Sequence, residues 1–200
     1  MSDTEASTRD RLLDAAMRLF LAKGADQVSV RAVNAEAGLN AGAVHYHFGS
    51  REGLITALLE RELRAMWPVA ADRLAAGPDG TVDIEALVTA VVEPFAEMVT
   101  TRDGRMLCHL LARAALPTGQ LPDVSAQFRP GQFEVAVGRS LPRLTVREVT
   151  ERTQLMFMLI MEVYGRPLST SPEAASPFPE TATMVAFLTA GLTAPTTSGR

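Results

Sequence analysis

The tetrapeptide His-Tyr-His-Phe at positions 45–48 brings together side chains that can bind metals, transfer protons and donate hydrogen bonds. His45 and His47 could share a metal ion on a strand, where alternate residues point the same way. On a helix they point about 200° apart, because helical ligand pairs need a spacing of three or four residues. Asn40 before the cluster and Gly49 after it are typical of helix ends, so we expect no metal site here.

Two other kinds of chemistry find little support in the spacing. Cys108 and His109 are adjacent and lack a matching second pair, which a metal site of this type would need. Nucleophilic catalysis requires a nucleophile or a carboxylate beside a histidine, and no local spacing supplies one. We therefore predict that the chain is not an enzyme and that it uses no metal and no cofactor.

Core packing explains only part of the tetrapeptide. Val44 and Phe48 share a helix face and are expected to pack on the preceding long helix. The side chains of His45, Tyr46 and His47 cannot all face inward as well, and those that face solvent offer hydrogen bonds to phosphate oxygens. Small residues at positions 41–43 would let the helix approach a groove closely. These features together point toward duplex DNA.

The elements that must position these residues are helices, and no series of strands is indicated. The first three helices are predicted at Thr8–Lys23, Val30–Ala37 and Ala41–Phe48, with Ser29 and Asn40 as N-caps of the second and third. The turn Gly38-Leu39-Asn40 between the last two predicts a helix-turn-helix unit.

A fourth helix is predicted from Ser50 to about Trp67, where Pro68 must end or kink it. Five further helices are expected at Val82–Thr101, Gly104–Leu116, Val124–Leu141, Val146–Tyr164 and Glu180–Leu192, with Pro130-Gly131 disturbing the third of these. The fold class is therefore all-α. We divide it into a helix-turn-helix domain at 1–50, a helical effector-binding and dimerisation domain at 51–192 and a flexible tail at 193–200.

Composition and charge suit an ordinary globular protein of 200 residues, 47% of them hydrophobic and 21% charged. The single cysteine, the polar first ten residues and the short apolar run Leu155–Met161 predict a cytoplasmic protein without a membrane partner. The net charge is −4, yet Arg9 to Arg51 contain six cations and four anions, a local excess of two positive charges. A mildly basic head on an acidic body permits a polyanion partner.

The segment SVRAVNAEAGLNAGAVHYHFGSREGL, from Ser29 to Leu54, and the helix RDRLLDAAMRLFLAKG before it resemble the DNA-binding domain of TetR-type transcriptional regulators. The resemblance covers roughly residues 9–60. It implies that Ser29 touches a phosphate, Arg31 reaches a base edge, and His47 and Arg51 anchor phosphates. It also implies that the third helix lies in the major groove as the recognition helix.

Two departures from the family pattern affect this interpretation. His45 stands where tyrosine is usual, so the usual phenol contact is in doubt, and Asn34 stands where alanine is usual, so its amide must point outward or find a partner. Because positions 41–43 carry no hydrogen-bonding side chains, we expect sequence preference to depend on thymine-methyl contacts and DNA shape. The predicted DNA contacts are Ser29, Arg31, Asn40, Ala41, Gly42, His45, Tyr46, His47 and Arg51.

The resemblance also implies that the last two helices pair two chains and that the middle of the chain binds an effector. Large, soft apolar side chains in the middle suit an adaptable pocket, although such residues equally suit plain core. The effector candidates are Trp67, Phe95, Met98, Met106, Cys108, His109 and Phe128. The dimer candidates are Leu155, Met158, Leu159, Met184, Phe187 and Leu188.

The function expected from these features is that of a ligand-responsive repressor. It would bind a palindromic double-stranded DNA operator as a homodimer and release it when a small apolar effector binds. The alternatives are an activator or a ligand-independent regulator of the same fold, and, from another class, a helical enzyme.

Overall fold

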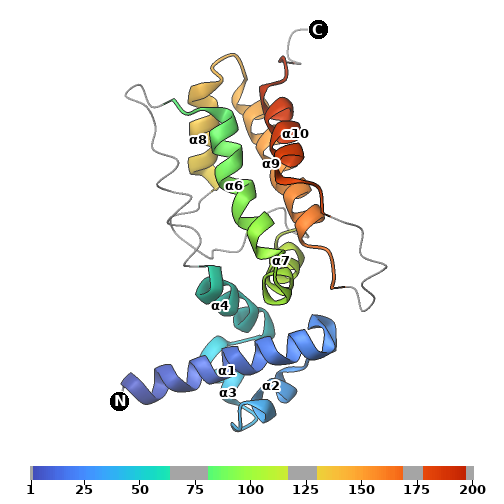
Figure 1. Ribbon diagram of the computed structural model, residues 1–200. Helices are drawn as coiled ribbons and strands as arrows, with labels where there is room; N and C mark the ends of the chain where they lie inside the picture. The colour runs from blue at the N-terminus through green and yellow to red at the C-terminus, as the bar shows by residue number, and fades with distance from the viewer. Residues whose placement is uncertain (1, 64–80, 117–129, 169–177, 197–200) are drawn as a thin grey trace. The chain divides into compact units, whose positions relative to one another are not determined.

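The protein forms two compact units, Met1–Leu63 and Arg64–Arg200, which are described separately (Figure 1). The computed structural model describes residues 2–63, 81–116, 130–168 and 178–196. All regular elements in these ranges are helices, so the all-α prediction is confirmed for the described residues. The first unit includes the helix that the sequence-based division at residue 50 assigns to the second domain.

The amino-terminal unit contains α1 (Ser2–Lys23), the 3-10 turn η1 (Ala25–Gln27), α2 (Val30–Glu36), α3 (Ala43–Phe48) and α4 (Arg51–Leu63). Helix α1 packs against η1, α2 and α4, and α3 packs against α2 and α4. The inner face of α1 includes four buried apolar residues. They are Leu12, Ala16, Leu19 and Phe20.

The turn between α2 and α3 depends on Gly38, whose φ of 65° is a left-handed conformation that disfavours other residues. Its N–H donates to the Ala35 carbonyl (3.0 Å), and the N–H of Leu39 donates to the Asn34 carbonyl (2.9 Å). These bonds satisfy the last carbonyls of α2 in the manner of a glycine C-cap. Helix α3 begins at Ala43, two residues later than predicted, because Asn40 accepts from the Gly42 N–H (3.2 Å) in a turn before the helix.

The carboxy-terminal unit contains α6 (Ile84–Met98), α7 (Arg102–Ala115), α8 (Pro130–Ser140), α9 (Val146–Tyr164) and α10 (Thr181–Thr193). Helix α9 packs against the other four, and α10 packs against α6 as well (Figure 1). The bounds predicted for α9 are confirmed, and its start carries a complete capping box between Thr145 and Glu148. Helix α8 begins at Pro130, a position at which proline's missing N–H costs nothing.

Several predicted features lie outside the described residues: the end of the fourth helix at Trp67, Pro68, and residues 124–129 of the expected helix Val124–Leu141. Among the residues that are described, no helix combines the length and the apolar character needed to cross a membrane.

Candidate functional site

The start of α2 presents Ser29 and Arg31 to solvent. The Ser29 hydroxyl accepts from the Ala32 N–H (3.2 Å) and is the helix N-cap, as predicted. Arg31 has no hydrogen bond or ion pair to any other residue that the structure describes. Its guanidinium is therefore available to an external acceptor.

Asn34 links α2 to the start of α3 from a buried position, with 1% of its surface exposed. Its side-chain Nδ2 donates to the Ala41 carbonyl (2.7 Å), and its Oδ1 accepts from the Val44 N–H (3.1 Å). The amide has therefore found partners, as its place in the sequence required. The N-cap of α3, Gly42, has no side chain to do this, so Asn34 acts as a cap supplied by the preceding helix.

Helix α3 has one face in the core and one in solvent. Val44 is fully buried, whereas His45 is exposed and Tyr46 is 78% exposed. Ala41 and Gly42, in the turn directly before the helix, are exposed as well, and we count them with this face. The exposed face thus combines small residues with an imidazole and a phenol. Because such a face can approach another surface closely, it has the form expected of a helix that enters a groove.

The other two members of the tetrapeptide are half-buried. The His47 ring lies edge-on to Tyr46, with 5.0 Å between the centroids, and 6.2 Å from Phe48. The guanidinium carbon of Arg9, on α1, lies 5.2 Å from the centre of the Phe48 ring. Phe48 thus contacts α1, and His47 lies at the border of the exposed face.

Arg51 and His45 each make a contact that the sequence pattern does not reveal. The Arg51 guanidinium donates from Nε to the Val28 carbonyl (3.3 Å) and from Nη2 to the Ala25 carbonyl (2.6 Å), so it holds the segment before α2. A phosphate contact by Arg51 would have to use Nη1 or the second N–H of Nη2. Nδ1 of His45 lies 2.9 Å from the Gly49 carbonyl.

The other arginines of this unit are largely engaged within it. Arg11 donates to the Ala37 carbonyl (2.7 Å), and Arg18 pairs with Glu36 (3.1 Å). Arg61 of α4 lies 2.7 Å from Glu62 and 2.9 Å from Asp14 of α1. Arg31 differs from these residues in two ways. It belongs to α2, the helix that precedes α3 in the helix-turn-helix unit, and no carboxylate of the described residues pairs with it.

Residues 12–58 match the family model described as bacterial regulatory proteins, tetR family. The amino-terminal domain belongs to the tetR family. This tetR-family domain spans the helix-turn-helix unit predicted from the sequence, and the predicted family resemblance is confirmed.

Other proteins are similar to this chain in sequence or in fold. An 89-residue stretch is 32% identical to the HTH-type transcriptional repressor KstR2 of Rhodococcus jostii (strain RHA1), covering 44% of this chain and 44% of that protein, so less than half of the curated relative is matched. The fatty acid degradation regulator FadR of Bacillus halodurans has the same fold, with a TM-score of 0.60, 17% identity and coverage of 92% of this chain and 94% of that one. The multidrug binding protein EbrR, solved with imidazole, is similar at a TM-score of 0.59 and 22% identity, over 94% and 97% of the two chains.

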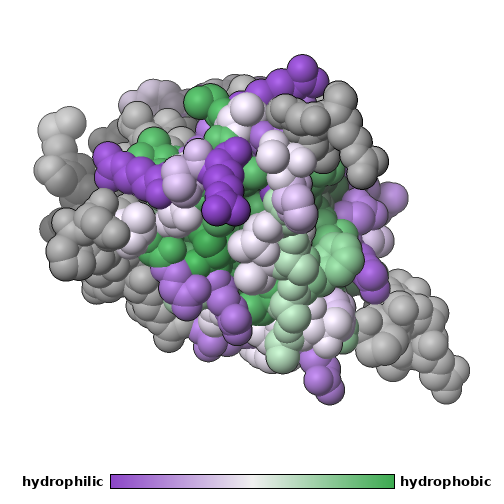
Figure 2. All heavy atoms as spheres, turned by 90° about the horizontal axis from the view of Figure 1, so that it is seen from above, coloured by the Kyte–Doolittle hydropathy of each residue, from purple (hydrophilic) through white to green (hydrophobic). Residues whose placement is uncertain are grey.

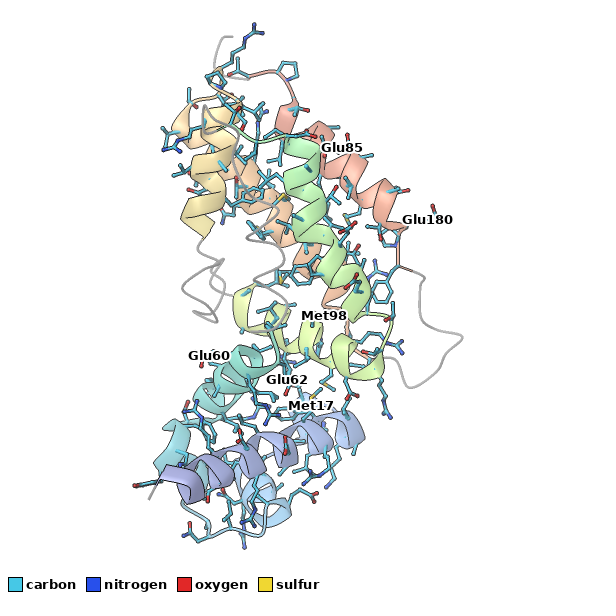
Figure 3. The ribbon with its side chains drawn as sticks, turned by 60° about the vertical axis from the view of Figure 1, so that its left-hand side comes forward. Met17, Glu60, Glu62, Glu85, Met98 and Glu180 are labelled. Atoms are coloured by element: carbon cyan, nitrogen blue, oxygen red, sulfur yellow. The ribbon has the colours of Figure 1, made fainter. Side chains whose placement is uncertain are left out.

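In the carboxy-terminal unit, four of the predicted effector residues are buried side chains of α6 and α7: Phe95, Met98, Met106 and Cys108. Met98, in the last turn of α6 (Figure 3), receives a hydrogen bond from the Cys108 thiol, with 3.9 Å between the two sulfurs. Burial raises the pKa of the Cys108 thiol to about 12, which keeps it protonated. Trp67 and Phe128 lie outside the described residues.

His109 is half-buried, and its Nδ1 lies 2.8 Å from the carbonyl of Gly165, directly after α9. Because a carbonyl oxygen can only accept, this nitrogen carries the proton. His109 therefore links α7 to the end of α9 as well as adding a polar group to the apolar set.

Tyr164, at the end of α9, was not among the predicted effector residues. Its ring is stacked between Phe95, at 6.1 Å, and Phe178, at 5.9 Å between centroids. Its hydroxyl is buried and has no hydrogen-bond partner among the described residues. Burial raises the pKa of this phenol, and the neighbouring Cys108 raises it further. The sequence does contain a signal for Tyr164, because a tyrosine at the end of an apolar helix is often buried. A buried tyrosine hydroxyl needs a hydrogen-bond partner, which an effector could supply.

The predicted dimer residues divide between surface and core. Leu155, Met158 and Phe187 are exposed, Phe187 by 64%, and Leu159 is half-buried. Met184 and Leu188 are buried in the chain's own core, because α10 turns this side toward its neighbours α6 and α9. Apolar residues also reach the surface in the middle of the face shown in Figure 2. Within the described ranges, no group of three or more His, Cys, Asp or Glu side chains could hold a metal ion.

Proposed function

We propose that this protein is a transcriptional repressor that binds a palindromic DNA operator as a homodimer and acts in the cytoplasm. The observation that carries the proposal is the exposed face of α3, in which Ala41, Gly42, His45 and Tyr46 face solvent while Asn34 fixes the helix from behind. The name of the curated relative, a transcriptional repressor, supports repression over activation.

The proposed contacts fall into two groups. Arg31, which has no partner among the described residues, and the exposed face of α3 would meet base edges, whereas Ser29 and His47 at the borders of that face would meet phosphates. A second copy would present the same surface to a second half-site about one helical turn away. The uncharged exposed side of α10, with Phe187, and Leu155 and Met158 of α9 support pairing through these helices.

We further propose that a small, largely apolar effector binds among the buried residues of α6, α7 and α9 and releases the DNA. The Tyr164 hydroxyl, which has no hydrogen-bond partner in the described part of the chain, supports one polar contact with the effector, and Phe95, Met98 and Met106 would supply apolar contacts. EbrR, a protein of the same fold, was solved with a small molecule bound.

Selection of bound duplexes from a random library tests the proposal directly. We expect an inverted repeat and an affinity that falls steeply with salt, because phosphate contacts release counterions. A protein that enriches no sequence and retains no duplex in dilute buffer would refute DNA binding.

Arg31→Ala tests the base contact and is expected to lower specific affinity by roughly 1–3 kcal/mol and to relax preference at one base pair of each half-site. Arg147→Ala makes the same change of charge at an exposed site on α9 and should leave preference unchanged. An unaltered selected sequence in Arg31→Ala would show that Arg31 reads no base.

A further inference from the structure

His45 is held in one tautomer by its contact with the end of its own helix. Its Nδ1 lies 2.9 Å from the Gly49 carbonyl oxygen. A carbonyl oxygen can only accept, so Nδ1 is the nitrogen that carries the proton. In the neutral imidazole the other nitrogen, Nε2, then has a free lone pair and acts as an acceptor.

The position of His45 places this acceptor on the exposed face of α3. Ala41 and Gly42 lie in the turn that leads into α3, and His45 follows them in the first turn of the helix. All three are exposed, and the two small residues bring no hydrogen-bonding side chain. His45 is therefore the polar group on the part of the face that can approach a groove most closely. His47, by contrast, is half-buried between Tyr46 and Phe48.

An acceptor at this position has a restricted set of partners on DNA. Phosphate oxygens only accept, so they cannot bind the lone pair of a neutral Nε2. In the major groove the donors are the exocyclic amino groups of cytosine (N4) and adenine (N6). The tyrosine usual at this position in TetR-type domains has a hydroxyl that can donate to a phosphate, so histidine reverses the direction of the hydrogen bond.

We infer that His45 is a specificity-determining residue whose Nε2 accepts a hydrogen bond from the amino group of a cytosine or adenine in each half-site. This inference rests on the proposed DNA-binding function and adds to it the chemical group that is read. It gives this recognition helix a direct base contact in addition to contacts with methyl groups and DNA shape.

The test removes single amino groups from a duplex selected by the wild-type protein. Each cytosine in a half-site is replaced in turn by 2-pyrimidinone and each adenine by purine, both of which lack the amino group. Binding is measured at about pH 8, above the range in which histidines ordinarily gain a proton. We expect one symmetric position at which the wild-type protein loses roughly 3- to 10-fold in affinity, the size of one hydrogen bond.

His45→Ala should lose a similar factor on the unmodified duplex and nothing further on the duplex that lacks the critical amino group. This non-additivity identifies the pair in contact. Tyr46→Ala, at the neighbouring exposed residue, is the matched control and should keep the full sensitivity to that amino group. His45→Lys replaces the acceptor with donors. Duplexes selected by this variant should carry guanine at that position, because the major-groove edge of guanine presents only acceptors.

The outcomes separate this inference from the function on which it rests. Suppose that the wild-type protein selects an inverted repeat, but that each amino-group deletion lowers the affinity of His45→Ala by the same factor as that of the wild-type protein. The inference is then overturned, and DNA binding stands. Selection of the unchanged base by His45→Lys would overturn it independently. If no duplex is selected at all, the proposed function itself fails.

Discussion

At the scale of single residues, Asn34 shows how a buried amide can replace a missing helix cap. Both polar atoms of its side chain are satisfied, one by the Ala41 carbonyl and one by the Val44 N–H. Because the amide is buried, leaving either backbone group without a partner would carry the cost of its desolvation. Asn34 therefore fixes the position of the exposed face of α3 without touching anything outside the protein.

Asn34→Ala is expected to lower the free energy of unfolding of the amino-terminal unit by about 1–3 kcal/mol, since it strands two backbone groups in a buried place. Urea unfolding followed by circular dichroism measures this. Asn40→Ala, which removes the exposed Asn40 side chain and its bond to Gly42, is the control and should cost about 0.5 kcal/mol or less. Equal losses in the two variants would contradict the capping role.

Cys108 predicts a dependence of stability on alkaline pH. Its pKa rises from 9.0 to about 12 in the folded protein because burial disfavours the thiolate. The unfolded chain therefore binds fewer protons than the folded chain above pH 9.0, and stability, full below that pH, declines as pH rises toward 12.

The slope from this one thiol approaches about 1.4 kcal/mol per pH unit. Cys108→Ala should remove that part of the decline, as measured by urea unfolding between pH 8 and pH 10.5 on both proteins. Groups that do not interact with Cys108 titrate equally in the two proteins, so the difference between the two slopes reports Cys108 and its effect on Tyr164. Parallel curves would show that Cys108 is not held neutral by burial.

The sequence could predict which side chains of the tetR-family domain face solvent. It could not predict the long-range hydrogen bonds that fix the backbone around them. The spacing of Val44 and the N-cap Ser29 follow from local rules that act within one helical turn. The bonds from Arg51 reach carbonyls 23 and 26 residues earlier in the chain. No local pattern contains such a pairing, because it depends on where the fold places Arg51 relative to Ala25 and Val28. A guanidinium can also bind a phosphate as readily as a carbonyl.

At the scale of elements, short helices depend on their neighbours. Helix α3 spans only Ala43–Phe48, and a helix of that length is not stable alone in water. It is held by packing on α2 and α4 and by the Asn34 bridge. The sequence predicts the start of α3 two residues too early, because Asn40 resembles an N-cap. Asn40 belongs instead to the turn before the helix, and the N-cap is Gly42.

The long apolar helices pose the opposite difficulty. The run Leu155–Met161 is apolar on every side, so its sequence does not say which side meets its own chain. The structure divides it, with Met156, Phe157 and Ile160 buried and Leu155 and Met158 exposed. The division depends on where α7, α8 and α10 lie around α9, which only the tertiary structure supplies.

Arg152 joins α9 to the end of α10. Its guanidinium donates to the carbonyls of Leu192 (2.9 Å), Ala194 (2.5 Å) and Pro195 (2.8 Å). Carbonyls at the end of a helix have no N–H partner within the helix, so these bonds satisfy them. Such charge-assisted bonds are stronger than neutral ones. They fix the last turn of α10 and the residues that follow it.

Arg152→Met keeps the aliphatic stem and removes these donors. We expect a loss of about 1–3 kcal/mol in the stability of the carboxy-terminal unit and faster amide hydrogen exchange in the last turn of α10. Arg147→Met is the matched control on the same helix, since the exposed Arg147 pairs with Glu151 at the surface and should contribute little. Unchanged exchange at the end of α10 in Arg152→Met would contradict this role.

At the scale of the whole molecule, the proposed function divides DNA recognition and assembly between the two units. One tetR-family domain offers few contacts to DNA, and a second copy would double them and require an inverted repeat. The helices that would join the copies lie at the other end of the sequence, where α10 contains no charged residue. Phe187 is 64% exposed on this helix, and under the proposed assembly the second copy would cover it.

Phe187→Glu is therefore expected to convert the dimer to a monomer at micromolar concentration, because it would bury a charge in an apolar contact between two chains. Light scattering combined with size-exclusion chromatography measures the mass. Val135→Glu makes the same kind of change at an exposed apolar residue of α8 and should leave the dimer intact. The monomer should also lose the steep affinity for the inverted repeat while keeping weak binding to a single half-site. A wild-type mass of one chain, or a dimer that survives Phe187→Glu, would place assembly elsewhere.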